Sequence, residues 1–211
     1  MINPTIFKSN DIRGIYPSEL NEEAVYDIGR SFVKYTGAKK VVIARDSRLS
    51  GEALFNSLAK GIKHQGADVC DIGRAPTECL YYAVGNHDFD AGIMLTASHN
   101  PKEYNGLKMV KKNGNDIEVI RGKDLLSAIE TDIPKEEAEV EINKKDIWKD
   151  YLIYILSYRI IKTMSIYSSI LPIIIFSNFT IIVISFINHY IIIIPVFCYN
   201  YHIRNWIISS I

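Results

Sequence analysis

The sequence predicts an α/β fold: a single three-layer domain with a mostly parallel or mixed sheet and helices on both faces. Short apolar runs rich in Val and Ile alternate along residues 1–133 with segments whose apolar side chains recur at helical spacing. Several of these runs end in polar, glycine-containing stretches, as strands of open α/β sheets do at the edge that binds ligands. This alternation is typical of a sheet that helices cover on both faces.

Strands and helices are expected to alternate until a final hairpin and helix. In chain order, the expected elements are an interrupted strand at 7–16, a helix at 22–36, a strand at 40–44, a helix at 51–64, a strand at 67–72, a helix at 79–84, a strand at 91–95, a hairpin at 107–117 and a helix at 121–131. Asn21 and Ser50 are the expected N-caps of the first two helices, and Gly37 ends the first. Asn113-Gly114 is the expected hairpin turn.

Charge is distributed unevenly, although the formal net charge of the chain is zero. All 24 acidic residues lie in residues 1–150 with 21 of the 24 Lys and Arg residues, so this part carries a net charge of −3. Bulk electrostatics therefore predicts no nucleic-acid partner. The charge-rich range 134–145 is expected to be a linker that leaves the domain.

The three cysteines predict neither a metal site nor a disulfide framework. Cys70, Cys79 and Cys198 lack metal-ligand spacing, and their number is odd. Cys70 and Cys79 lie in apolar contexts and are expected to be core thiols. Because no apolar secretion signal begins the sequence, we expect a cytoplasmic localisation.

Residues 158–211 form a tail of a different composition. The last 61 residues contain no Asp, Glu, Gly or Ala, and isoleucine fills 21 positions. The missing amino acids have codons that begin with G, whereas Ile, Tyr and Asn codons are rich in A and T. We therefore hypothesise that the tail, whose structure is doubtful, is read out of frame. Resequencing the locus and translating all three frames tests this, because a glycine-rich continuation in another frame is then expected.

Hydropathy alone supports a different interpretation of the tail. The range 170–197 is long and apolar enough to predict a membrane-spanning helix. If the tail is genuine, the chain is a membrane-anchored, non-catalytic binding module. Extraction that depends on detergent would then be expected.

The loop after the strand at 91–95 carries the residues best suited to chemistry. Its sequence is Thr-Ala-Ser-His-Asn-Pro, with Ser98 near the apex and Pro101 forcing the turn that follows. A serine hydroxyl needs help to act as a nucleophile or phosphate carrier. His99 offers a group for proton transfer or hydrogen bonding, and Lys108 offers positive charge for a phosphoryl group. A polar turn with a capping serine is the alternative interpretation.

A second polar segment, Arg45-Asp46-Ser47-Arg48, follows the strand at 40–44. Two arginines at this edge of the sheet suggest a phosphate site. However, Asp46 lies between them and is expected to pair with one of them, so we favour a structural role.

The two halves of the serine region, residues 96–101 and Tyr-Asn-Gly-Leu-Lys at 104–108, together resemble the active-site loop of the alpha-D-phosphohexomutases, the phosphomannomutase/phosphoglucomutase family. Asp-Ile-Arg-Gly at 11–14 resembles the N-terminal motif of that family, although Asn10 stands where many members have an aromatic residue. The resemblance covers residues 1–157. It implies that 1–133 is domain I and that 146–157 begins the first helix of domain II.

The resemblance also implies a reaction, intramolecular phosphoryl transfer between C1 and C6 of hexose phosphates through a phosphoserine and a hexose bisphosphate intermediate. Ser98 would carry the phosphoryl group, and His99 and Lys108 would orient and neutralise it. Arg13 and Asn100 would bind substrate. The phosphate on Ser98 would be one ligand of Mg²⁺, while family members supply the others from an Asp-x-Asp-x-Asp loop that the printed sequence lacks. We therefore expect this chain, as a truncated enzyme, to be inactive as a mutase.

Other classes of site are less well supported by the sequence. No Gly-x-Ser-x-Gly motif is present, and no aspartate is marked as the partner of His99 in a hydrolase triad. The five histidines show no metal-ligand spacing.

Overall fold

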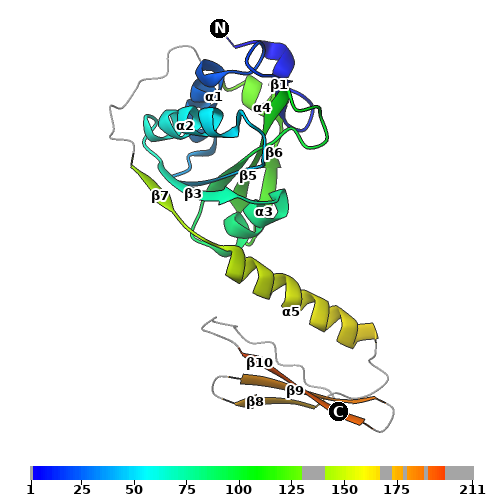
Figure 1. Cartoon of the computed structure of the whole chain (residues 1–211). Coiled ribbons are helices and arrows are strands. Elements are labelled where there is room, and N and C mark those ends of the chain that lie inside the picture. The colour runs from blue at the N-terminus through cyan, green and yellow to red at the C-terminus, as the bar shows by residue number, and fades with distance from the viewer. Residues whose placement is uncertain (1, 130–140, 167–172, 178–179, 188–189, 198–211) are drawn as a thin grey trace. The chain divides into compact units, whose positions relative to one another are not determined.

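The computed structural model describes residues 2–129, 141–166, 173–177, 180–187 and 190–197 (Figure 1). In chain order, its elements are η1 (Pro4–Ile6), β1 (Ile12–Ile15), α1 (Glu22–Thr36), β2 (Lys40–Arg45), α2 (Gly51–Lys63), β3 (Asp68–Arg74), α3 (Thr77–Asn86), β4 (Ala91–Leu95), β5 (Tyr104–Asn113), β6 (Asp116–Ile120), α4 (Gly122–Leu126), β7 (Ile142–Lys144), α5 (Trp148–Ile166), β8 (Ile173–Ser177), β9 (Thr180–Ile187) and β10 (Tyr190–Phe197). The predicted alternation of strand and helix is confirmed.

The N-terminal part is built on a mixed seven-stranded sheet, as predicted. Its strand order is β1-β5-β4-β2-β3-β7, and β6 pairs with β5 beyond the end of β1. The strands β4, β2, β3 and β7 run parallel, whereas β5 is antiparallel to β4, β1 and β6. Because β2 and β4 are parallel neighbours, the loops that follow them meet at one edge of the sheet.

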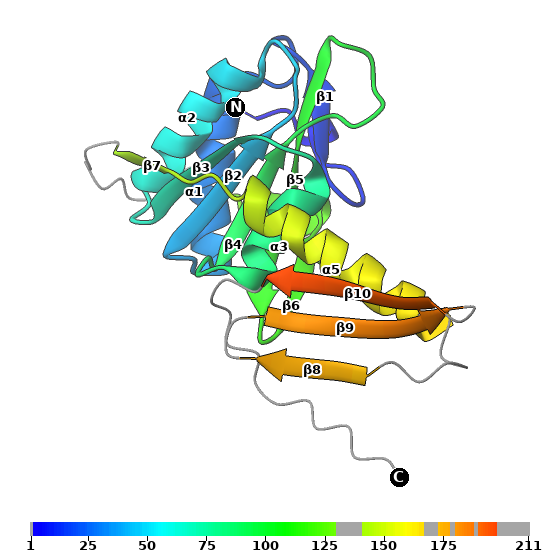
Figure 2. The same cartoon turned by 60° about the horizontal axis from the view of Figure 1, so that its bottom comes forward.

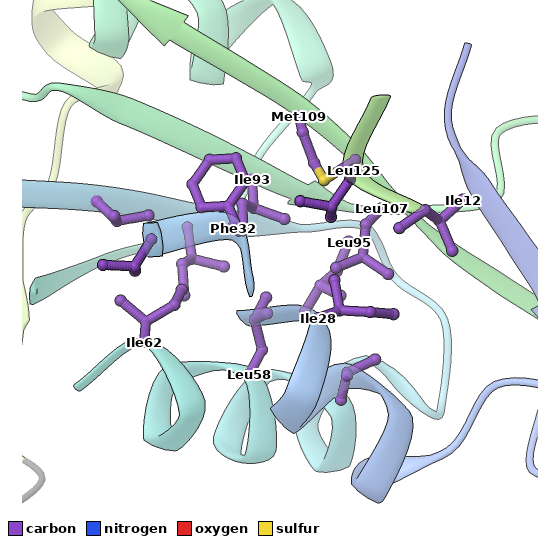
Figure 3. Close-up of a cluster of buried hydrophobic side chains, with 14 of the residues drawn as sticks. Ile12, Ile28, Phe32, Leu58, Ile62, Ile93, Leu95, Leu107, Met109 and Leu125 are labelled. Atoms are coloured by element: carbon purple, nitrogen blue, oxygen red, sulfur yellow. The ribbon is translucent and has the colours of Figure 1, made fainter. Parts of the chain in front are cut away.

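Helices cover both faces of this sheet (Figures 1 and 2). On one face, α1 and α2 pack apolar side chains such as Ile28, Phe32 and Leu58 against Ile93 and Leu107 of the strands (Figure 3). On the other face, α3 buries a smaller cluster that includes Leu80 and Val84. The alternation of side chains along the strands supplies one apolar set to each face.

The two cysteines predicted for the core are buried there as free thiols, Cys70 on β3 and Cys79 on α3. Burial raises the pKa of Cys70, and it raises the pKa of Cys79 to about 11. Because the thiolate is the reactive form, neither thiol is suited to redox or nucleophilic chemistry. Cys198 lies outside the described residues.

Two elements differ from the prediction. The helix expected at 121–131 is α4, which ends at Leu126. Part of the predicted linker at 134–145 is instead strand β7, which pairs in parallel with β3 through Ile142 and Lys144. Ile142 packs against the core, so local charge density misled the prediction at this point. The rest of the predicted linker, except 141 and 145, lies outside the described residues.

The junction between α3, β7 and α5 contains a histidine whose ring is largely buried. The Lys145 ammonium lies 3.1 Å from His87 Nδ1, and the Asp150 carboxylate lies 4.0 Å from Nε2. Lys112 donates to the His87 carbonyl oxygen, and the Tyr82 ring stands edge-on to the imidazole. Burial, reinforced by Lys145 and Lys112, lowers the pKa of His87, while Asp150 opposes the shift.

This lowered pKa predicts that acidification destabilises the domain. The unfolded chain binds a proton at His87 near pH 6.5, before the folded chain does. The contribution of neutral His87 to the free energy of unfolding is therefore fully present above that pH. It decreases as the pH drops towards the folded pKa, by at most about 1.4 kcal/mol per pH unit. The free energy of unfolding is measured by urea titration at several pH values between 7.5 and 5.5. It should fall less steeply with decreasing pH for His87→Asn than for the wild type. Equal slopes would contradict the assignment.

The chain divides into two compact units, Met1–Leu152 and Ile153–Ile211. The helix expected from 146 onwards is α5, which starts at Trp148 and continues to Ile166. In the second unit, β8, β9 and β10 form an antiparallel sheet in which β9 is central. Within the described part of the chain, no helix has the length and apolar character needed to cross a membrane.

Candidate functional site

The serine loop follows β4, and the Arg45–Arg48 segment follows β2, at the same edge of the sheet. The backbone N–H of Asp46 donates to the Leu95 carbonyl oxygen at 3.0 Å, which joins the two loops where the strands end. The position agrees with the rule that ligands of open α/β sheets bind at the carboxyl ends of strands.

Ser98 has an unusual backbone conformation. Its φ angle is +56°, and among the described residues it is the one non-glycine residue with a positive φ. A left-handed conformation costs an L-residue about 1–2 kcal/mol, so the surrounding structure must impose it. The Ser98 hydroxyl lies 3.0 Å from His99 Nδ1. In the tautomer protonated at Nε2, His99 accepts a hydrogen bond from this hydroxyl.

A chain of hydrogen bonds fixes the backbone of Ser98. Its N–H donates to Thr96 Oγ1 at 2.9 Å, and the Thr96 hydroxyl donates to Asp46 Oδ2 at 2.7 Å. Asp46 in turn pairs with Arg48, whose Nε lies 3.1 Å from Oδ2. The expectation that Asp46 pairs with one neighbouring arginine is confirmed.

The guanidinium of Arg48 also reaches across to the serine loop. Its two terminal nitrogens donate to four main-chain carbonyl oxygens, those of Ser98 at 3.1 Å, Asn100 at 2.8 Å, Pro101 at 2.6 Å and Tyr104 at 2.8 Å. The side chain is only 11% exposed. Arg48 therefore holds the main chain of the serine loop in place.

Arg13 and Asn100, both predicted to bind substrate, are brought together. Arg13 Nη1 donates to Asn100 Oδ1 at 2.6 Å, and Arg13 Nε donates to Asp11 Oδ2 at 2.8 Å. Arg13 lies opposite Gly106 in the β1–β5 ladder, and a Cβ at Gly106 would overlap the Ile12 carbonyl oxygen and come within 3.2 Å of Arg13 Cγ. Glycine is thus required where β1 brings Arg13 to the loop.

Lys108 is one strand away from the serine. It lies opposite Met94 in the β4–β5 ladder, so the two side chains are on the same face of the sheet. Met94 lines the cavity described below. Within the described residues, the Lys108 side chain makes no hydrogen bond or ion pair, so its ammonium group is not already engaged by a carboxylate.

A cavity of about 850 Å³ opens at this edge of the sheet. Ser98 and Asn100 line it, together with Arg48, Thr96 and Met94. Its volume is within the range of small-molecule sites. Arg13, His99 and Lys108 are not among the lining residues, so the predicted set lies partly in the cavity and partly beside it.

Two sets of contacts near the site, those of Arg48 and those of the Ser50 hydroxyl, were not predicted from the sequence. The sequence interpretation favoured a structural role for the Arg45–Arg48 segment but did not foresee that Arg48 binds the serine loop. Ser50 is the N-cap residue of α2, as predicted, but its side chain makes no capping hydrogen bond. Its hydroxyl instead accepts a hydrogen bond from the buried Asn105 Nδ2 at 2.9 Å. The signal that pointed to the Arg48 contacts was the position of the Arg45–Arg48 segment, which follows β2, the strand next to β4.

The described residues do not by themselves fit the Mg²⁺ that the resemblance implies. Among them, no three His, Cys, Asp or Glu side chains are grouped as metal ligands. The carboxylate nearest to Ser98 along the hydrogen-bond chain, Asp46, is already engaged by Thr96 and Arg48. A hard, octahedral cation needs several oxygen ligands, which this part of the chain does not group together.

Comparison with known proteins identifies relatives of the sheet domain. Residues 4–139 match the family model described as phosphoglucomutase/phosphomannomutase, alpha/beta/alpha domain I. The chain is 46% identical over 117 residues to a phosphomannomutase of Salmonella montevideo. This alignment covers 56% of this chain and 26% of that protein. It is 39% identical over 155 residues to a phosphomannomutase of Escherichia coli K12. That alignment covers 70% of this chain and 34% of that protein.

A solved structure shows the same similarity in three dimensions. A phosphoglucomutase/phosphomannomutase family protein from Burkholderia thailandensis superposes with a TM-score of 0.63 and 35% identity, over 72% of this chain and 35% of that one. The chain thus spans 26–35% of the length of these three proteins.

Proposed function

Because the chain belongs to the phosphoglucomutase/phosphomannomutase family, we propose that it carries the phosphoryl-transfer serine of a hexose phosphate mutase, with Ser98 as the phosphoryl carrier. One observation supports this above all. Ser98 lines a cavity and has a strained backbone conformation, and its hydroxyl lies 3.0 Å from the His99 Nδ1 atom. Non-glycine residues held at positive φ cluster at active sites and ligand-binding loops.

The surrounding residues suit a phosphoryl group on Ser98. In the loading step, Ser98 Oγ bonds to the phosphorus of a hexose bisphosphate while the bond from phosphorus to the sugar oxygen breaks. His99 takes the hydroxyl proton, and the sugar oxygen leaves as the hydroxyl of a hexose monophosphate once it gains a proton. Lys108 and Arg13 supply positive charge beside the transferring group, and Asn100 orients Arg13.

The full cycle requires more than these residues. In the proposed enzyme, phosphoserine gives its group to the free C1 or C6 hydroxyl of a hexose phosphate, and the bisphosphate then turns round in the cleft before returning the other phosphoryl group. Mg²⁺ and the clamp for the distal phosphate would come from parts that match the remaining length of the relatives. We therefore expect loading of Ser98 but no mutase turnover from this chain alone.

The test is to incubate the full chain with glucose 1,6-bisphosphate labelled in its phosphoryl groups, in a buffer containing Mg²⁺. We expect one phosphoryl group per chain, located on Ser98 by peptide mass spectrometry, and no incorporation in Ser98→Ala. Ser127→Ala, which changes an exposed serine at the end of α4, should incorporate as much as the wild type. Label at any residue other than Ser98, or none, contradicts the proposal.

Turnover is measured separately. Conversion of mannose 1-phosphate to mannose 6-phosphate by this chain, dependent on Mg²⁺, would show that the parts matching the remaining length of the relatives are not needed. That result would overturn the expectation that the chain is inactive alone, while leaving the role of Ser98 intact.

A further inference from the structure

The guanidinium of Arg48 holds together carbonyl groups that would otherwise repel each other. The four acceptors belong to Ser98, Asn100, Pro101 and Tyr104, so one side chain connects both ends of the serine loop. The acceptors are 50 to 56 residues away in the sequence. A planar cation with several fixed donors can satisfy four such oxygens at once, whereas an ammonium group cannot reach them in that geometry.

The same arginine also acts on the other side of Ser98. Through Nε it binds Asp46 Oδ2, the atom that accepts the Thr96 hydroxyl, and Thr96 Oγ1 accepts the N–H of Ser98. The carbonyl oxygen of Ser98 and its N–H are therefore both bound, one directly by Arg48 and the other through Asp46 and Thr96. Fixing both peptide groups that flank Ser98 fixes its φ and ψ angles.

We propose that Arg48 is a positioning residue for phosphoryl transfer: with Asp46 it holds Ser98 in the left-handed conformation that presents Oγ to the cavity. The proposal rests on the proposed function of Ser98. The Arg48 guanidinium donates to main-chain carbonyl oxygens and to Asp46, and so acts on the reacting hydroxyl through the backbone. Its role is to keep that hydroxyl in line with the incoming phosphorus.

The kinetic test compares the rate of Ser98 labelling in the full chain for wild type, Arg48→Lys and Arg48→Met. The rate is measured at saturating glucose 1,6-bisphosphate and at a temperature where circular dichroism shows each variant to be folded. Misplacement of the hydroxyl should slow labelling about 100-fold in both variants, while the bisphosphate concentration for half-maximal rate changes little. Arg121→Met, which removes an exposed arginine that pairs with Asp124, is the matched control and should label at the wild-type rate.

Labelling of folded Arg48→Lys at the wild-type rate would overturn the proposal, because a lysine cannot reproduce the four carbonyl contacts. A change only in the bisphosphate concentration that gives the half-maximal rate would also overturn the proposal, since that result would indicate that Arg48 binds the bisphosphate directly. If the wild type itself is not labelled, the proposed function fails, and the next measurement still tests the positioning role.

The second measurement is a double-mutant cycle on thermal unfolding with Ser98→Gly. Glycine adopts positive φ without penalty, so Arg48 imposes no strain on it. When Ser98 is present, Arg48→Met should let the loop relax and release the backbone strain at Ser98. This release offsets part of the stability lost with the Arg48 contacts. The fall in Tm caused by Arg48→Met should therefore be larger in the Ser98→Gly background, by about 3 °C. Equal falls in both backgrounds would mean that Arg48 does not hold Ser98 in its strained conformation.

Discussion

Replacing Asp71 by alanine is expected to lower the free energy of unfolding by about 3–5 kcal/mol, the cost of breaking a buried ion pair from one side. Asp71 Oδ1 accepts a hydrogen bond from Arg45 Nη1 at 2.7 Å, and the side chains are 5% and 13% exposed. The same oxygen accepts the Gly73 N–H at 2.7 Å, near the C-terminal end of β3. Its removal leaves a largely buried guanidinium without its best partner.

The matched control uses the same arginine. Glu52 pairs with Arg45 Nε at 3.0 Å, but its own side chain is 65% exposed. Glu52→Ala should therefore cost no more than about 1 kcal/mol, because water screens and replaces an exposed partner. Urea unfolding at pH 7 measures both variants. Similar losses for the two substitutions would show that burial does not decide the strength of this pair.

Substituting Gly61 by alanine is expected to force apart the two helices that cover one face of the sheet. Gly61 lies in α2 against α1, and an added Cβ would overlap the carbonyl oxygen of Tyr26 and come within 2.9 Å of its carbonyl carbon. Backbone atoms in the middle of α1 cannot move aside as a flexible side chain would. We expect a loss of about 2–3 kcal/mol, since overpacking then outweighs the better helix propensity of alanine.

Gly85→Ala in α3 is the matched helical substitution. The nearest atom to an added Cβ there is Ile117 Cγ2 at 3.9 Å, an ordinary van der Waals distance. With no clash, helix propensity should dominate, and this variant should gain up to about 1 kcal/mol. Denaturant unfolding of the pair gives the comparison. A stabilised Gly61→Ala variant would mean that α1 and α2 can separate at little cost.

The interior of the domain was predictable from the sequence because each element carries its own local pattern. The apolar stripe of α1, its Asn21 cap and Gly37 at its end all appear as predicted, with Asn21 Oδ1 accepting the Ala24 N–H and Gly37 at φ +67°. Such signals depend on neighbours within a few residues. β7 escaped prediction because three residues carry too little pattern to outweigh the charges around them.

Candidate residues for the site could be proposed from the sequence, but their geometry could not. Ser98, His99, Asn100, Arg13 and Lys108 could be selected from motifs and their resemblance to a family. Ser50 is at the predicted N-cap position, but its hydroxyl makes no capping bond and instead accepts a hydrogen bond from Asn105, 55 residues away. Local capping rules cannot detect such a distant partner.

The sequence by itself determined the order of strands and helices and the chemical groups of the serine loop, because both depend on residues close together in the chain. Only the tertiary structure decided what holds Ser98 in its left-handed conformation. The contacts of Arg48 with the loop join residues 50 to 56 positions apart, and Arg13 meets Asn100 across 87 positions. Such contacts exist only because the parallel pairing of β2 with β4, and the antiparallel pairing of β1 with β5, bring the ends of distant segments to one edge of the sheet.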